Sequence, residues 1–212
     1  SILKTRRFGY DGKGQLKLKS ASQAEDIWKD SSAKDLILER FVNFSREFSV
    51  IGSRSKDGQI SCFDPGENVH KEGILRTTTV PANLTMQQKT EAILITAKIL
   101  EALNYVGVIG IEFFLEKNSL VINEFAPRVH NSGHWTQNGC TVDQFEQHIR
   151  AITGWKLGNA ERHSDIIMEN LIGDEIYKTN QLVADGSLAL HLYGKADVKP
   201  GRKMGHFNRI KN

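Results

Sequence analysis

Apolar and polar residues alternate with the two-residue period of β-strands along much of the chain. Residues 1–4 and 16–18 lie on either side of a glycine-rich turn and predict a strand–loop–strand hairpin. Further strands are predicted over residues 36–42, 47–53, 59–63, 106–115 and 120–125, with a turn at 56–58. The pattern favours antiparallel pairs of strands.

Two segments repeat their apolar residues at helical spacing. Thr85 and Gln88 form a capping-box pattern at the start of the first, and apolar residues then recur at positions 93, 97, 100 and 103. The second spans residues 143–153 and ends at Gly154, while residues 22–31 are also helix-like. The part after residue 154 is predicted to hold short strands and turns. Together these elements predict an α+β protein of mostly antiparallel sheets flanked by helices.

Composition is ordinary for a globular protein, with 39% of the 212 residues hydrophobic and 25% charged. The net charge of +3 is spread over short basic runs, which argues against a nucleic-acid-binding protein. No segment reaches the ~18 consecutive apolar residues of a membrane span, and the start is unlike a signal peptide. Cys62 and Cys140 have no Cys-x-x-Cys partner, so we expect reduced thiols in a cytoplasmic protein. Residues 1–4 read as a strand already under way, so further sequence is expected upstream.

Glu112 and Glu124 are the most informative residues for chemistry. If the turn between their strands is centred on Asn118, the two carboxylates face each other on one side of the sheet. Like charges in that position destabilise a sheet unless a cation lies between them, and Mg²⁺ typically uses one or two carboxylates together with substrate phosphates. The alternative is two solvated glutamates, but the strongly apolar flanking strands favour the metal site.

A glycine-rich loop contains Gly9, Gly12 and Gly14 and is preceded by Lys4. Glycines let backbone N–H groups approach phosphate oxygens closely, and a nearby lysine adds a point charge. The loop lacks the Gly-Lys-Ser/Thr of a Walker motif, and taken alone an ordinary flexible turn is the commoner explanation.

Two further polar segments could hold anions. Arg128 and His130 follow directly after Glu124; the guanidinium can hold a planar anion, and the imidazole can donate a hydrogen bond or move a proton. Nearer the end, residues 195–203 form a basic turn around a Pro-Gly pair, which suits a phosphate monoester. A solvated basic loop is the alternative for that turn.

Three stretches together resemble the 5-(carboxyamino)imidazole ribonucleotide synthase family, also called the ATPase subunit of phosphoribosylaminoimidazole carboxylase. They are residues 9–15 (GYDGKGQ), 123–136 (NEFAPRVHNSGHWT) and 200–206 (PGRKMGH). The central stretch is the specific one, although Ala126 stands where many related enzymes carry Asn. The resemblance implies a partial ATP-grasp fold, with residues 1–38 as the rest of a small lid subdomain and 39–212 as the large catalytic domain with its C-terminal β portion. On this resemblance, the family's N-terminal domain and extreme C-terminus are expected to lie outside the present sequence.

The resemblance also implies roles for individual residues. Glu112 and Glu124 are the implied magnesium ligands, in agreement with the hairpin. The implied ATP-binding residues are Lys4, Gly9, Gly12, Gly14, Glu39, Val42, Glu47, His70, Asn123 and Glu124. Within this set Lys4 contacts the phosphates, the backbone from Glu39 to Val42 meets adenine, and Glu47 holds the ribose hydroxyls.

The implied catalytic residues, which bind bicarbonate, are Arg128, His130 and Asn131, and the implied ribonucleotide-binding residues are Tyr10, Lys195, Arg202 and Lys203. The implied reaction has two steps: bicarbonate attacks the γ-phosphate of ATP to give carboxyphosphate and ADP, and carboxyphosphate, or CO₂ released from it, carboxylates the amine of 5-aminoimidazole ribonucleotide. This is a step of purine biosynthesis. The implied cofactors are ATP and Mg²⁺, and the expected protein is a homodimer that binds small molecules and neither nucleic acid nor membrane.

Two other functions stay open. A formate-dependent glycinamide ribonucleotide transformylase would share the metal hairpin and a Pro-Arg-x-His element, but residues 131–135 and the terminal basic turn favour the carboxylating family. A non-catalytic nucleotide-binding module derived from the same fold would explain the missing ends, whereas the retained Glu112, Glu124 and Arg128 argue against it.

Overall fold

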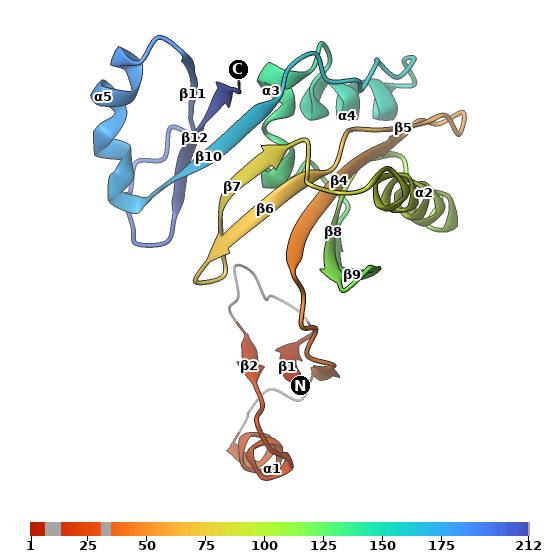
Figure 1. Ribbon diagram of the computed structural model, residues 1–212, viewed down its shortest axis with the longest axis vertical. Coiled ribbons are helices and arrows are strands. Elements are labelled where there is room, and N and C mark those ends of the chain that lie inside the picture. Colours follow the sequence, from red (N-terminus) through yellow and green to blue (C-terminus); the bar gives the residue numbers. More distant parts are fainter. Residues whose placement is uncertain (7–13, 31–34, 212) are drawn as a thin grey trace. The chain divides into compact units, whose positions relative to one another are not determined.

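The computed structural model describes residues 1–6, 14–30 and 35–211 of the chain (Figure 1). Gly9, Tyr10 and Gly12 of the predicted site lie outside the described residues. Contacts within the chain divide it into two compact units. The first unit comprises residues 1–43 with 71–74, and the second comprises residues 44–70 with 75–212.

The first unit is built on a three-stranded sheet of order β2-β1-β3. Its strands are β1 (Ile2–Thr5), β2 (Gln15–Lys17) and β3 (Leu36–Glu39), and β1 pairs antiparallel with both neighbours. The helix α1 (Ala21–Asp30) follows β2 and lies within one residue of its predicted bounds. The predicted hairpin between β1 and β2 is therefore confirmed, while β3 is shorter than expected.

A nine-stranded sheet forms the second unit, in the order β11-β12-β10-β7-β6-β4-β8-β9, with β5 paired to β4. Its strands are β4 (Arg46–Arg54), β5 (Ile60–Cys62), β6 (Gly66–Lys71), β7 (Ile74–Val80), β8 (Gly107–Glu116), β9 (Ser119–Ala126), β10 (Ile166–Ile172), β11 (Leu188–Leu192) and β12 (Lys203–Ile210). The sequence did not predict β6 and β7, and it understated β10 and β12, which are seven and eight residues long.

Helices cover both faces of this sheet (Figure 1). The helix α2 (Met86–Ala102) packs against β4, β5 and β8, and it begins with the predicted capping box of Thr85 and Gln88. The short α3 (Thr136–Gly139) and the longer α4 (Gln144–Thr153) belong to the opposite side, where Trp135 is buried. As predicted, Gly154 ends α4, with a positive φ of 80°.

Alternation along the strands gives each face its own core. Phe48, Val50, Ile109 and Ile111 point to the α2 side, whereas Ile51 and Val108 join Trp135 and Met168 on the other side. The short helices η1 (Asn131–Gly133), η2 (Gly173–Lys178) and α5 (Thr179–Ala184) were not predicted. In the described part of the chain, no helix has the length and apolar character needed to cross a membrane.

Candidate functional site

The β8–β9 hairpin places Glu112 directly opposite Glu124, as the sequence predicted. The turn, however, is Lys117–Asn118, so Glu116 pairs with Ser119 and Phe113 with Ile122. A register shift between Glu112 and Phe113 then adds one residue to β9. Without this bulge Asn123 would face Glu112, so the predicted pairing is right although its turn centre is not.

The two carboxylates stand in different surroundings. The Glu112 side chain is 15% exposed, whereas Glu124 is exposed. Burial, and after it the negative charge of Glu124, raise the pKa of Glu112, while a hydrogen bond from Asn123 acts in the opposite direction. A cation between the carboxylates would remove the repulsion. Two facing carboxylates are the oxygen ligands that Mg²⁺ uses together with substrate phosphates. The described residues contain no group of three or more metal-ligating side chains.

Glu47 and His70 form an ion pair beside the carboxylate hairpin. Glu47 on β4 places Oε2 2.6 Å from Nδ1 of His70, at the end of the neighbouring β6. Burial alone would lower the pKa of His70, but Glu47 and, after it, Glu112 raise the pKa. The two residues that were predicted separately as nucleotide contacts are thus partners of each other.

The loop after β9 brings His130 to the carboxylates. Nε2 of His130 lies 3.5 Å from Oε1 of Glu112. Gly110 on β8 makes this approach feasible, because a Cβ at that position would lie 2.7 Å from Cβ of His130. Burial, and then the positive charges of Arg128 and Lys203, lower the pKa of His130 to about 3. The ring is therefore neutral near pH 7 and can donate or accept a hydrogen bond.

The other two residues of the predicted catalytic set differ in their surroundings. Arg128 is exposed, and its Nη1 donates to the carbonyl of Val129 at 3.0 Å. Asn131 exchanges hydrogen bonds with Asn170 on β10, at 2.9 and 2.7 Å. The guanidinium is thus accessible to an anion, whereas the amide of Asn131 is engaged within the protein.

Gln144, which sequence reasoning missed, fixes the backbone of His130. It is fully buried at the start of α4; its Oε1 accepts from the His130 N–H at 2.9 Å and its Nε2 donates to the His130 carbonyl at 2.8 Å. The same Nε2 lies 2.9 Å from Nδ1 of His134. The preceding Asp143 caps α4 and marks where the helix starts, but no pattern distinguishes Gln144 as buried.

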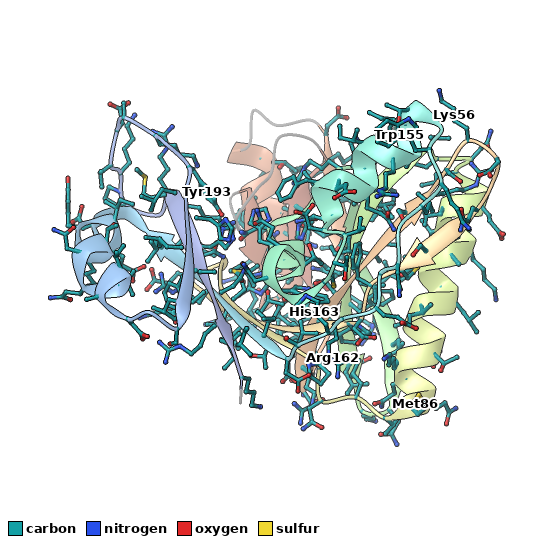
Figure 2. All side chains as sticks on the ribbon, turned by 90° about the horizontal axis from the view of Figure 1, so that it is seen from above. Lys56, Met86, Trp155, Arg162, His163 and Tyr193 are labelled. Atoms are coloured by element: carbon teal, nitrogen blue, oxygen red, sulfur yellow. The ribbon has the colours of Figure 1, made fainter. Side chains whose placement is uncertain are left out.

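Three stacked histidine rings, also unforeseen, adjoin this loop. The His206 ring centre lies 4.7 Å from that of His134 and 4.6 Å from that of His191. The hydroxyl of Tyr193, labelled in Figure 2, lies 2.8 Å from Nδ1 of His206. Burial, and then the neighbouring histidines, lower the pKa of His206 to about 2, so the stack packs as neutral rings.

Among the residues of the basic turn, Lys203 lies near enough to the site for its charge to affect the pKa values of histidines there. Its positive charge helps to lower the pKa of His130 and acts against the rise in the pKa of His70. Lys195 donates from Nζ to the Lys203 carbonyl at 2.6 Å, and Arg202 donates from Nη1 to the carbonyl of Asp197 at 3.0 Å. Lys203 therefore places a positive charge near the site, while Lys195 and Arg202 donate hydrogen bonds to backbone carbonyl oxygens of the same turn.

The first unit contains four of the predicted site residues that the structure describes, namely Lys4, Gly14, Glu39 and Val42. Nζ of Lys4 on β1 lies 2.7 Å from Oε2 of Glu39 on β3. Val42 follows β3 and is half-buried. Gly14 has a φ of 76°, and a Cβ there would lie 2.6 Å from the Thr5 hydroxyl, so this position requires glycine.

Comparisons with known proteins agree with the resemblance seen in the sequence. The model of the ATP-grasp domain matches residues 1–145, and that of the phosphoribosylaminoimidazole carboxylase C-terminal domain matches residues 167–212. N5-carboxyaminoimidazole ribonucleotide synthase of Brucella melitensis is 54% identical over 99% of this chain and 59% of its own length.

Solved structures show the same likeness. N5-carboxyaminoimidazole ribonucleotide synthetase of Thermus thermophilus has a TM-score of 0.89 at 38% identity. This match covers 99% of the present chain and 56% of the Thermus chain. N5-carboxyaminoimidazole synthase of Aspergillus clavatus, in complex with ADP and 5-aminoimidazole ribonucleotide, has a TM-score of 0.90 at 29% identity. This match covers 99% of the present chain and 57% of the Aspergillus chain. The chain thus spans less than two thirds of the length of these relatives.

Proposed function

The chain belongs to the ATP-grasp family, and on this premise we propose that it carries the catalytic part of a ligase that carboxylates 5-aminoimidazole ribonucleotide with ATP and bicarbonate. The observation that carries the proposal is the facing pair of Glu112 and Glu124, with the neutral His130 3.5 Å from Glu112. The relatives named N5-carboxyaminoimidazole ribonucleotide synthase support the choice of substrate. The family resemblance further supports a homodimer, and the two free cysteines support the cytoplasm as its compartment.

Phosphoryl transfer needs positive charge around the triphosphate and an aligned nucleophile. In the proposed reaction an oxygen of bicarbonate attacks the γ-phosphorus of ATP, and the bond from that phosphorus to the departing ADP oxygen breaks. Glu112 and Glu124 would hold Mg²⁺, which when bound neutralises charge on the phosphates. Arg128 offers its exposed guanidinium to bicarbonate, and His130 offers one hydrogen bond from a neutral ring.

The second step joins the activated carboxyl group to the ribonucleotide. The exocyclic amine attacks the carboxyl carbon of carboxyphosphate, phosphate leaves, and the amine loses a proton. We assign the phosphate monoester of the ribonucleotide to Lys195, Arg202 and Lys203, because the family resemblance implies that role for these basic residues of the turn. We assign the ATP phosphates to Lys4 and the ribose hydroxyls to Glu47.

ADP release by the full-length protein tests this function. The protein is incubated with Mg-ATP and bicarbonate, with and without 5-aminoimidazole ribonucleotide. We expect strong stimulation by the ribonucleotide that disappears when bicarbonate is omitted. Stimulation only by formate with glycinamide ribonucleotide would instead establish the transformylase, and ATP binding without any stimulated turnover would establish a silent nucleotide-binding module.

A further inference from the structure

A continuous chain of buried polar side chains crosses the sheet and ends on His130. The Thr78 hydroxyl on β7 donates to Oδ1 of Asn68 on β6 at 2.8 Å, and Nδ2 of Asn68 donates to the Ser49 hydroxyl on β4 at 3.2 Å. Ser49 donates to the hydroxyl of Ser132 at 2.6 Å, and Oγ of Ser132 lies 2.8 Å from Nδ1 of His130. None of the first four residues is more than 5% exposed.

The direction of these hydrogen bonds determines which ring nitrogen of His130 carries the proton. Ser49 accepts the amide N–H of Asn68, so its single hydroxyl proton is free to go to Ser132. Ser132 thereby accepts from Ser49, and its own proton is left for Nδ1 of His130. An Nδ1 that accepts a hydrogen bond carries no proton, so in the neutral ring the proton must reside on Nε2.

One further contact favours the same direction. The backbone N–H of Ser132 also points to Nδ1 of His130, at 3.4 Å. Reversing the chain would set a proton on Nδ1 against the Ser132 N–H. That contact would be repulsive, so the surroundings of Nδ1 distinguish the two directions of the chain, which the amide and imidazole groups alone do not. On the far side of the ring, Nε2 lies 3.5 Å from Oε1 of Glu112, so a proton on Nε2 is directed to the carboxylate hairpin.

We propose that Ser132, Ser49, Asn68 and Thr78 are positioning residues that hold the ring proton of His130 on Nε2, so that His130 acts as a hydrogen-bond donor to an oxyanion at the carboxylate hairpin. The identity of that oxyanion as bicarbonate rests on the proposed function. The assignment of the proton does not, because it follows from the contacts that Nδ1 makes in the neutral ring. His130 in this form binds an anion through its N–H and cannot take up a proton at the nitrogen that faces the site.

The tautomer can be read directly by NMR. Long-range ¹H–¹⁵N correlation spectra of the full-length protein with ¹⁵N-labelled histidine distinguish a protonated Nε2 from a protonated Nδ1, and His130→Gln identifies the signals. We expect the Nε2–H form in the metal-free wild-type protein. A predominant Nδ1–H form would overturn the proposal, whatever the variants show.

Substitution of Ser49 tests the chain of hydrogen bonds at a distance from the ring. In Ser49→Ala the Ser132 hydroxyl loses its donor, so it can accept from Nδ1–H, and a mixture of tautomers should appear. We expect kcat for ADP release to fall about tenfold, the effect of one weakened hydrogen bond, with little change in the KM for ATP. Rescue by Ser49→Thr, which retains the hydroxyl, would support positioning, whereas an unchanged tautomer in Ser49→Ala would overturn the role of the chain.

The same strand provides a matched control. Ser53 on β4 is fully buried, and its hydroxyl donates to the Ser61 carbonyl at 3.0 Å, away from His130. Ser53→Ala should lose comparable stability and leave both the tautomer and kcat unchanged; an altered tautomer there would count against the proposal. If the tautomer is as expected but ADP release does not depend on bicarbonate, the proposed function fails while the assignment of the proton stands.

Discussion

Replacing Gln144 with alanine should damage the site and the fold by amounts that can be measured separately. Gln144 is fully buried and exchanges two hydrogen bonds with the backbone of His130. The His130 carbonyl also accepts from the N–H of Gly133 at 2.9 Å, so it would keep one partner. The His130 N–H has Gln144 as its described partner and would be left unpaired in a half-buried position.

The expected loss of stability follows from these contacts. An unsatisfied buried donor costs about 1–3 kcal/mol, and the space left by the shortened side chain adds on the order of 1 kcal/mol. Gln144→Ala should therefore lower the free energy of unfolding by about 2–4 kcal/mol, which for a chain of this size corresponds to roughly 2–4 °C in Tm per kcal/mol. Denaturant unfolding monitored by circular dichroism measures the loss.

The same helix offers a control for the effect on activity. Gln147 is also fully buried in α4 and exchanges two hydrogen bonds with a backbone, but its partner is Gly158, at 3.0 and 2.8 Å. Both alanine variants should lose similar stability. Only Gln144→Ala should lower kcat for ADP release, by about tenfold, at a temperature where both are folded. Equal loss of turnover in the two variants, or wild-type turnover in Gln144→Ala, would refute the role of Gln144 in holding His130.

Three further predictions follow from the site and its surroundings. Glu124→Ala should abolish Mg²⁺-dependent ADP release with the fold retained, and an active, folded variant would contradict the metal assignment. Burial and neighbouring charges lower the pKa of His134 to about 4 and of His206 to about 2, so below pH 6.5 the unfolded chain binds protons that the folded chain does not. As the pH is lowered from 6.5 to 4, the free energy of unfolding should therefore decrease, by up to about 1.4 kcal/mol per pH unit for each ring. Denaturant titrations that give the same free energy of unfolding across this pH range would contradict the prediction. Burial raises the pKa of Cys62 and of Cys140 to about 12, so a thiol reagent at pH 8 should react rapidly with neither until the protein is unfolded.

Local chemistry explains what could be predicted from the sequence. The capping box at Thr85 and the left-handed residue Gly154 depend on contacts within one turn of a helix, and both are present as expected. The apolar run that begins β8 likewise indicates a buried strand, and β8 is buried on both faces over Gly107–Ile111. The sequence could therefore locate the carboxylate hairpin before any pairing was known.

The bulge in β9 shows where such reasoning ends. The turn at Lys117–Asn118 alone would have placed Asn123 opposite Glu112. The extra residue that realigns Glu124 has no marker in the sequence, since no glycine lies near it. The register of two paired strands depends on how they pack along their whole length. The predicted turn centre was wrong and the bulge was not foreseen, but the two errors cancelled, so the pairing of Glu112 with Glu124 was predicted correctly by coincidence.

The residues that orient His130 escaped prediction for a related reason. Ser49 and Ser132 are 83 positions apart, and Asn68 and Thr78 come from two strands that the sequence did not reveal. Each looks like an ordinary polar residue until the sheet brings it to its partner. The residues predicted to bind bicarbonate lie within four positions of one another, from Arg128 to Asn131, whereas the residues that hold His130 in place are dispersed along the sequence.

The distribution of buried polar groups between the two faces of the sheet supports a functional reason for this dispersal. On the α2 side, the buried residues that the structure describes are apolar apart from Thr96, whose hydroxyl bonds to its own helix at the Ala92 carbonyl. On the opposite side, Ser49, Asn68 and Gln144 are buried in contact with one another or with the His130 loop. Buried polar groups cost stability unless every partner is present. A face that needed only to be stable would resemble the α2 side, so Ser49, Asn68 and Gln144 are best explained by the precise orientation that they give to His130.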